Sequence, residues 1–541
     1  MPSSVLPAQC TSDTGESSDG SSTDDSDPDF KPGHAMKKKR VDVPLTLTSE
    51  ALDASDVGSR KASQIVSAYA VARGDAPVAR SRIQRALEKS RLEKVREISA
   101  SASDCTALFC DGRDDTTRTQ RPGALVKVHN ISVNMHPGDV FLGHFTCSGR
   151  HTGQALADQL ASFIEERGIN ADQVLIIGGD GTNSVVGYKG GWMACLEARL
   201  GRPLTRVVCL CHQAELPYRA LFRTLAGRTL SKGRFEGEIG EMITGAVHER
   251  PLAAFRPLGS AADLPALSPE VERSLSSDMQ LLYQCARCVT TGDGSAVEHR
   301  IHGQLNMARW YTAQSRLLRA YMSQPAPSAE DDGMVTDRHR RLTTLALYIV
   351  AVYLPTVLAI KHKPDLVEAP RHLFDQLQRQ RQHMGGPDLQ TVQGSLCGNA
   401  LMAHPENVVL GMLGDERRDV RARAVQMVRE ARARRQPGPV RQFRVQSASV
   451  NVSAHQYTEL VDVTMYARVA DVEPPCVRFL SDGDLEALVD EPLRTRVPCH
   501  TQSTERAVKL TTQSSGAVAG AVRQDGYSLN KIAFRRHFRG Q

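Results

Sequence analysis

Two aspartates, Asp111 and Asp180, follow short apolar runs at Cys105–Cys110 and Val174–Ile177. Apolar runs of this length beside glycine are typical of buried strands. Acidic side chains at the carboxyl ends of strands in an α/β sheet line the crevice where ligands bind. Two carboxylates that meet there repel each other unless a cation lies between them, and Mg²⁺ (or Mn²⁺) prefers such oxygen ligands. The pair therefore predicts a divalent-metal site suited to phosphodiester chemistry.

Each aspartate also has an ordinary structural explanation. Asp111 opens an Asp-Gly-Arg sequence that is typical of a turn. Asp180 lies in Gly-Asp-Gly-Thr-Asn, a sequence typical of a turn or of the residue that caps a helix. The residues alone leave these alternatives open.

The elements that would position the two acids can be predicted from changes in hydrophobic period. We expect strands, helices and strands in the order β-β-β-α-β-α-β, at 105–110, 124–133, 140–145, 152–167, 174–177, 185–200 and 206–210. This order is typical of the RNase H-like fold, an α/β fold with a mixed sheet in which the first and fourth strands are neighbours. Asp111 and Asp180 would then meet although they are far apart in the chain.

The remainder of the 541-residue chain divides by composition. We expect a disordered acidic and Ser-rich tail at 1–57, a helical leader at 58–100, the first part of the RNase H-like core at 101–228, a large, mostly α-helical insertion at 229–495, the last core helix at 496–525 and a basic tail at 526–541. The basic cluster Lys37–Arg40 in the first tail predicts nuclear import and a nuclear location.

Bulk properties permit a polyanionic partner without requiring one. The net charge is +6, with 24% charged and 40% hydrophobic residues, and twelve cysteines are too few for a disulfide framework. The N-terminus lacks the pattern of a secretory signal. The apolar run Leu342–Ile360 contains Pro355 and stands among polar helical segments, so we expect a buried core helix and no membrane association.

The segment from Asp180 to Phe222 resembles the middle of hAT-like and Mutator-like transposases. The matching positions are Asp180 with Asn183, and Cys209 with His212. The chain resembles more closely a group of uncharacterised, transposon-derived animal proteins, and this likeness runs in order from about residue 105 to 515. Its further matching positions are Asp111, Asp115, Glu215, Leu216, Pro217, Arg219, Arg309, Trp310, 403–407, 498–502, Glu505 and Arg506.

The resemblance implies a transposase of the Asp-Asp-Glu type, or a domesticated descendant, that cleaves DNA and transfers the strand. It makes Glu505 the third acid, so that Asp111, Asp180 and Glu505 would be both the catalytic and the metal-binding residues. The alternative is that Glu505 is an ordinary first-turn glutamate, which favours the helix dipole. Glu215 is a competing acid that would otherwise serve structure.

Two further pairs have a functional and a structural interpretation. Cys209 and His212 form half of a zinc site, which Cys499 and His500 would complete, or they are a buried cysteine and a hydrogen-bonded histidine. A structural Zn²⁺ would be a second cofactor beside Mg²⁺.

The resemblance implies that Arg309 and Trp310 contact DNA, with the indole stacking on a base. The alternative is that Trp310 belongs to a helical core. A lone pair, Cys285 and Cys288, is expected to lie on a helix rather than to bind metal.

Two other functions remain open at this stage. The first 100 residues contain a single cysteine, Cys10, so no zinc finger for DNA recognition forms there. This favours a catalytically inactive DNA-binding or scaffold protein as the alternative to the nuclease, with DNA and a second copy of the chain as partners. An RNase H-like exonuclease is a third interpretation.

Overall fold

The computed structural model describes residues 45–539 with internal gaps. The gaps are 119–124, 148–151, 188–189, 231–233, 246, 260–263, 304, 306–308, 329–332, 398–404, 435–456, 460–472 and 519. The expected import segment Lys37–Arg40 therefore lies outside the described residues.

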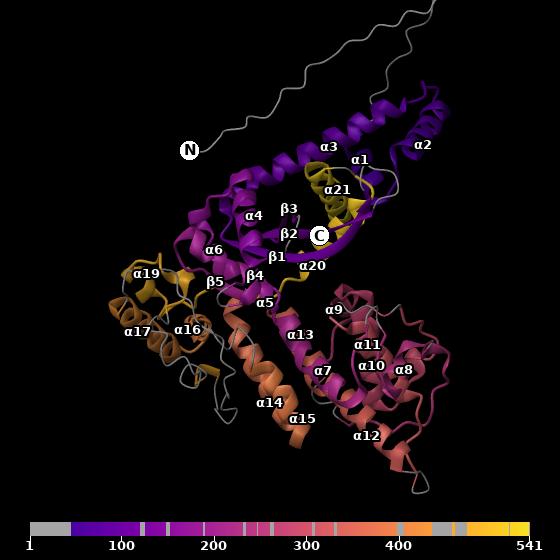
Figure 1. Cartoon of the computed structure of the whole chain (residues 1–541), viewed down its shortest axis with the longest axis vertical. Coiled ribbons are helices and arrows are strands. Elements are labelled where there is room, and N and C mark those ends of the chain that lie inside the picture. Colours follow the sequence, from indigo (N-terminus) through magenta and orange to yellow (C-terminus); the bar gives the residue numbers. More distant parts are fainter. Residues whose placement is uncertain are drawn as a thin grey trace, which may run out of the picture.

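A five-stranded mixed sheet lies at the centre of the chain in the order β3-β2-β1-β4-β5 (Figure 1). The strands are β1 (Ala107–Arg118), β2 (Leu125–His136), β3 (Val140–Cys147), β4 (Ile176–Gly179) and β5 (Thr205–Val208). β1 pairs antiparallel with β2, and β2 with β3, whereas β1, β4 and β5 run parallel. The α/β class, the predicted element order and the neighbouring first and fourth strands are confirmed.

Alternation along β1 divides its side chains between two cores. Leu108 and Cys110 pack into a core that includes α4 (Gly153–Glu166) and α6 (Trp192–Leu200). Ala107 and Phe109 belong to the other core, which includes α7 (Leu210–Ala226). β4 approaches the Phe109 ring so closely that a Cβ on Gly178 would lie 1.6 Å from it. Only glycine fits that position of β4.

The second face of the sheet is completed by helices from both ends of the chain. α20 (Gln502–Ser515) packs across β1 and β2, while α3 (Arg80–Ala100) and α21 (Ala521–Arg539) pack against β3. Figure 1 shows α20 and α21 beside the sheet, although almost the whole helical insertion separates them from β5 in sequence.

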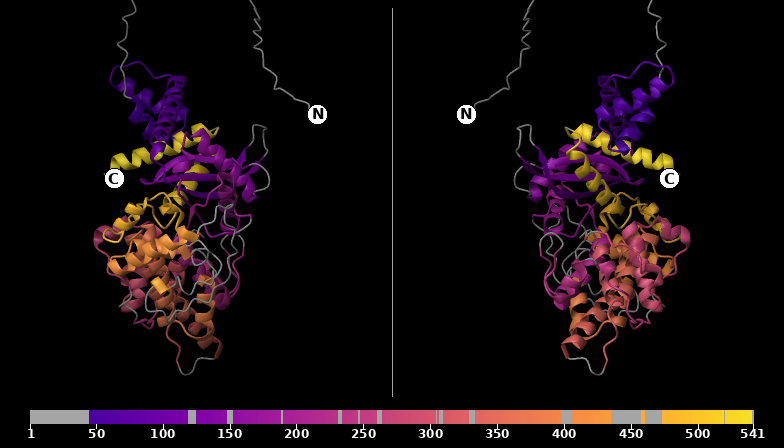
Figure 2. Two further views of the ribbon diagram at one scale, coloured as in Figure 1. Left: turned by 90° about the vertical axis from the view of Figure 1, so that its left-hand side faces the viewer. Right: turned by 90° about the vertical axis from the view of Figure 1, so that its right-hand side faces the viewer.

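The segment between α7 and α20 is helical, as predicted for the insertion, and extends away from the sheet (Figure 2). Its described residues form the α-helices α8 (Glu238–Thr244), α9 (Pro269–Ser274), α10 (Ser277–Thr291), α11 (Tyr311–Met322), α12 (Gly333–Tyr348), α13 (Leu354–His362), α14 (Ala369–His383), α15 (Gly386–Cys397), α16 (Pro405–Leu413), α17 (Arg418–Arg434) and α19 (Asp482–Ala487).

The apolar run Leu342–Ile360 lies in one continuous helix, Gly333–His362, which joins α12 and α13 through a π-helical segment. By length and composition this helix would also suit a membrane, but 78% of its most apolar window is buried inside the protein. In this fold it occupies the place of a core helix.

Both chain ends depart from the predicted tails. α1 (Leu45–Ala54) forms within the range expected to be disordered, and α21 forms where a basic tail was expected. The two helices are tied together because Asn530 donates to Asp53 at 2.8 Å and Lys531 pairs with Asp56 at 2.5 Å. These partners are hundreds of residues apart, so local composition did not indicate that either end would be packed.

Candidate functional site

The register of β1 and β4 brings Asp111 and Asp180 together. Phe109 is paired with Gly178, and each aspartate lies two residues further along its strand direction. Because the strands are parallel and side chains alternate, both carboxylates fall at the same level and on the same side of the sheet as Phe109. The predicted meeting of the two acids is thus what the register produces.

Asp111 does not end its strand, contrary to the expectation. β1 continues to Arg118 beside β2, with Asp111 opposite Ser132, so the turn interpretation of Asp-Gly-Arg is wrong. β4 stops pairing with β1 at Gly178, and beyond that point β1 continues beside β2 alone, while β2 stays paired with β3 as far as His129. Asp111 therefore lies just past the end of β4, at an open edge that Asp180 shares.

Asp180 also has the turn role that its sequence predicted. Its Oδ1 accepts hydrogen bonds from the backbone N–H of Thr182 at 3.1 Å and from the Thr182 hydroxyl at 2.7 Å. α5 (Asn183–Val186) begins directly afterwards. The second carboxylate oxygen accepts no hydrogen bond from the residues that the structure describes, so the turn fixes the side chain and leaves one oxygen for a ligand.

Glu505 reaches the same region from α20. The helix is held across the sheet by a hydrogen bond of 3.0 Å between Ser132 and Thr511, and by one that Ser515 donates to Asp115. Glu505 is half-buried, with 29% of its side chain exposed.

The three acids influence one another electrostatically. Burial, opposed by the charge of Arg309 and reinforced by Asp180 and Glu505, raises the pKa of Asp111 to about 7. Burial also raises the pKa of Glu505, again against the effect of Arg309. Within the described ranges, however, no three His, Cys, Asp or Glu side chains lie close enough together to hold one metal ion.

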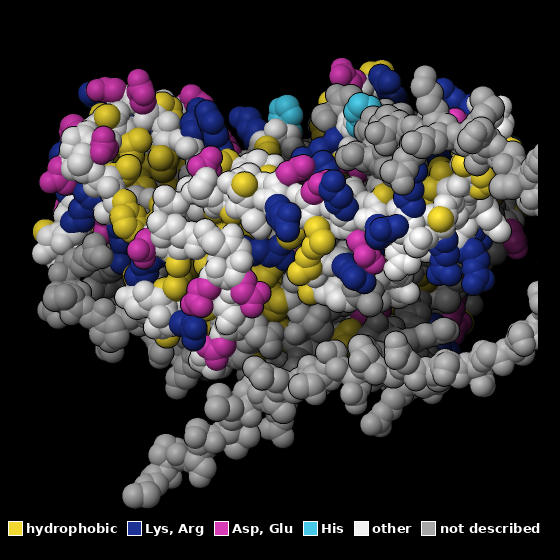
Figure 3. Space-filling model, turned by 90° about the horizontal axis from the view of Figure 1, so that it is seen from above, with side chains coloured by type: hydrophobic (Ala, Val, Ile, Leu, Met, Phe, Trp, Pro, Cys, Tyr) yellow, Lys and Arg dark blue, Asp and Glu magenta, His cyan; other side chains and the backbone are white. Residues whose placement is uncertain are grey.

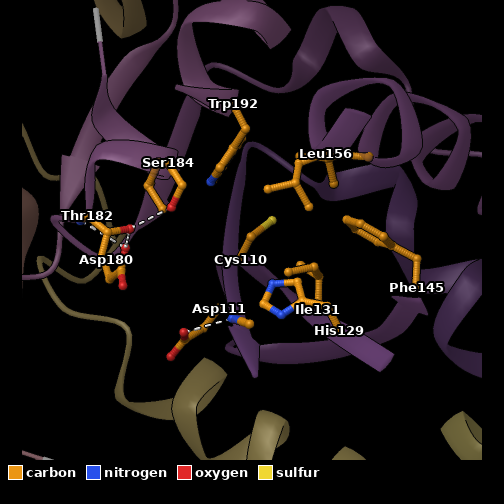
Figure 4. A pocket seen from close by; sticks show the side chains of 13 residues that line it. Cys110, Asp111, His129, Ile131, Phe145, Leu156, Asp180, Thr182, Ser184 and Trp192 are labelled. Atoms are coloured by element: carbon orange, nitrogen blue, oxygen red, sulfur yellow. Dashed lines mark hydrogen bonds between the residues drawn. The ribbon is translucent and has the colours of Figure 1, made fainter. Parts of the chain in front are cut away.

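A cavity of about 220 Å³ opens beside the two aspartates. Figure 4 shows Asp111 and Asp180 on one side of it, with Leu156 and Phe145 on the other. Trp192 closes part of the wall. One rim of the hollow is acidic, and much of its wall is apolar.

Arg309 links Glu505 to the buried part of the site. Its Nε lies 3.2 Å from Glu505, one terminal nitrogen lies 4.0 Å from Glu215, and the other donates to the Cys209 sulfur at 3.3 Å. Arg309 and Trp310 both have φ of +55°, a conformation that is rare for bulky residues. This strain turns the guanidinium toward the acids while the next side chain enters the core.

Trp310 lies in the core and not on a DNA-facing surface. Its side chain is 1% exposed, and its ring lies 5.4 to 5.9 Å from the rings of Phe222, Phe235 and Tyr218. The expectation that the indole stacks on a base is therefore corrected for this structure. The aromatic residues of α7 and of the Phe235 segment enclose the ring from several sides.

Cys209 is a buried hydrogen-bond acceptor. Its sulfur accepts from Arg309 and, at 3.3 Å, from the backbone N–H of Thr501. Burial would raise the pKa of this thiol, but the hydrogen bond from Cys211 and the charge of Arg309 lower it well below its ordinary value. The hydrogen bond to the Cys209 sulfur helps to hold Arg309 where it contacts Glu505.

The segment of Cys499 and His500 does lie beside Cys209, as the zinc hypothesis required, since Leu210 N–H donates to the Cys499 carbonyl at 3.0 Å. His212 Nδ1 instead lies 3.7 Å from Glu215 Oε2. This pairing fits the alternative of a buried cysteine and a paired histidine.

Glu215 is 2% exposed and lies among His212, Arg219 and Arg309, which fits a structural acid. Cys285 and Cys288 lie buried on α10, as predicted for two helix residues.

Sequence reasoning missed the contacts that Arg309 makes with Glu505 and Cys209. No local pattern relates residues from three separate segments, and the left-handed backbone at Arg309 is likewise not indicated by the sequence around it. Comparison of the sequence with protein-family models and with curated proteins finds no match.

Proposed function

We propose that this chain is a transposase-like nuclease, or a domesticated descendant of one, with an RNase H-like core that hydrolyses DNA phosphodiester bonds and transfers the strand. The supporting observation is geometric: Asp111 and Asp180 extend from neighbouring parallel strands at the same register, and α20, which packs across β1, carries Glu505, whose charge acts on Asp111. The sheet order 3-2-1-4-5 supports the same assignment.

The donor chemistry fits a hard divalent cation. Asp111, Asp180 and Glu505 offer carboxylate oxygens, the ligands that Mg²⁺ and Mn²⁺ prefer. Bound there, such a cation would lower the pKa of a water and stabilise charge on the phosphoryl oxygens. Burial is the main cause of the raised pKa of Asp111, and the charges of Asp180 and Glu505 add to it; a bound cation would favour the ionised carboxylate.

The chain's own residues would orient these donors. Thr182 fixes Asp180 through one oxygen, and Arg309 pairs with one oxygen of Glu505 at 3.2 Å. Preorganisation of this kind places the ligands before substrate arrives and lowers the reorganisation needed in the transition state. Zn²⁺ is less well supported, because the Cys209 sulfur is already used by Arg309 and Thr501.

Nicking of supercoiled circular DNA tests the proposal. The full chain is expected to nick it in Mg²⁺ or Mn²⁺ and to lose that activity in EDTA. Asp180→Asn is expected to lower the rate by at least about 100-fold, because a neutral amide binds the cation poorly. Asp114→Asn, an exposed change on the same sheet, is the matched control and is expected to keep the rate.

A closed circle also separates the rival functions. An exonuclease requires free ends and would act only after the circle is linearised. A protein that binds the circle but never nicks it with either metal would refute the enzyme and support the DNA-binding scaffold. The ion pair between Glu505 and Arg309 favours that second function, because it occupies the acid that the metal would need.

A further inference from the structure

A groove of about 880 Å³ lies on the Glu505 side of the site, formed by the insertion and α20. Its lining includes four cationic side chains, Arg300, Arg309, Arg506 and Lys509, against two carboxylates, Asp278 and Glu505. On the face seen in Figure 3, by contrast, basic and acidic side chains are interspersed, so the positive charge is not gathered there.

Three of these cations have no partner among the described residues. The side chains of Arg300, Arg506 and Lys509 are exposed and form no ion pair or hydrogen bond with any residue that the structure describes. Arg506 and Lys509 are three positions apart on α20, so they share a helix face. Unpaired cations concentrated in a concave surface attract polyanions more strongly than the same charges scattered over a convex one.

Three helices also begin at the groove. Ser277 starts α10, Tyr311 starts α11 and Gln502 starts α20, and all three residues line it. The first turn of a helix presents free backbone N–H groups and the positive end of the helix dipole. The hydroxyl group of Ser276 adds a neutral donor to the same wall.

We infer that this groove binds the phosphodiester backbone of a single DNA strand and leads it to the acids. The inference rests on the proposed function for the identity of the polyanion, and it names the surface that holds it. Sugar-phosphate backbone matches the groove because phosphates take up unpaired cations and helix N-termini irrespective of base sequence. The volume suits a short stretch of one strand.

The test measures binding of a short fluorescent single-stranded DNA of mixed sequence to the full chain, in EDTA, over a range of KCl concentrations. The groove variant combines Arg300→Gln, Arg506→Gln and Lys509→Gln. Each cation that releases a phosphate counterion contributes about 0.7 to the slope of log affinity against log salt for single strands. For the groove variant, the magnitude of this slope should therefore be smaller by about 2. That difference corresponds to about 100-fold weaker binding at ~0.1 M salt.

The charge-matched control combines Lys363→Gln, Arg381→Gln and Arg434→Gln, three exposed cations outside the groove. Its affinity is expected to stay near that of the wild type. Equal losses in the two variants would mean that net charge alone drives binding, and unchanged binding in the groove variant would mean that the strand lies elsewhere. Either result overturns the inference.

A second variant avoids any question of folding. Ser277→Glu places a carboxylate in the first turn of α10, where the helix dipole favours it, while its charge repels a phosphate in the groove. Binding should weaken with unfolding temperature unchanged.

The groove inference and the nuclease proposal can be refuted independently of each other. If the wild-type chain binds the strand through these cations but never cleaves DNA, the groove inference stands and the nuclease proposal is refuted. If the chain cleaves DNA but all three cations are dispensable for binding, only the groove inference is refuted.

Discussion

Replacing Asp111 with asparagine should stabilise the metal-free protein while it abolishes cleavage. Asp111 is half-buried, and the charges of Asp180 and Glu505 act on its carboxylate, opposed by that of Arg309. Burial, with these two neighbours, raises its pKa from 3.8 to about 7 despite Arg309. An amide keeps nearly the same shape without the charge, so Asp111→Asn removes the repulsion and retains the packing.

The size of the effect follows from that pKa. A rise from 3.8 to about 7 corresponds to about 4 kcal/mol, at about 1.4 kcal/mol per tenfold change in proton affinity. Solvent reaches a half-buried carboxylate and screens part of the interaction, so we expect about 2 kcal/mol.

The stability that Asp111→Asn adds should depend on pH in a defined direction. Folded Asp111 takes up a proton below about pH 7, whereas the unfolded residue does so only near 3.8. Between these values the folded wild type holds more protons, so its stability rises as the pH falls. The advantage of Asp111→Asn is therefore full above about pH 7 and vanishes below about pH 4.

Urea unfolding at several pH values, in EDTA and in Mg²⁺, measures the size of this stability difference and its dependence on pH. In EDTA the variant should be the more stable protein at pH 8. Mg²⁺ at ten times its dissociation constant should stabilise the wild type by about 1.4 kcal/mol and the variant by much less. Asp114→Asn is the control, and its effect should be opposite in sign, because hydrogen bonds from Lys127 and His129 lower the pKa of Asp114.

Two outcomes would refute this account. A variant that is less stable than the wild type at pH 8 would show that burial and the neighbouring acids do not destabilise the ionised Asp111. Equal stabilisation of both proteins by Mg²⁺ would show that Asp111 does not contribute to a metal site.

Three further predictions concern the residues around the acids. Arg309→Met should lower the cleavage rate and move the acidic limb of its pH profile to higher pH, because loss of the cation raises the pKa of Asp111 and Glu505. An acidic limb at the same pH would exclude this positioning role. Trp310→Ala should destabilise the fold by about 3–5 kcal/mol in urea unfolding, with DNA affinity of the folded protein retained, whereas a stacking role requires the opposite pattern. Cys209 should resist alkylation by iodoacetamide in the folded protein despite its lowered pKa, because the sulfur is buried, and mass spectrometry of the alkylated peptide measures this.

The sequence by itself determined the strands, the helices between them and their order along the chain. Short apolar runs separated by Gly and Pro mark each strand, and the change to a helical period marks the helices between them. These are local properties, so the predicted ranges agree with β1 to β5 except at their ends. The position of Asp180 after β4 followed for the same reason, since a glycine-rich turn ends that strand.

Only the tertiary structure decided how the acids are supported. β1 runs past Asp111 because β2 pairs with it there, and strand pairing is a contact between distant segments. Trp310 is a core residue because rings from α7 and from Phe235 pack around it. The cations of the groove come from both the insertion and α20, and their common location follows from how these elements pack, which no spacing along the chain indicates.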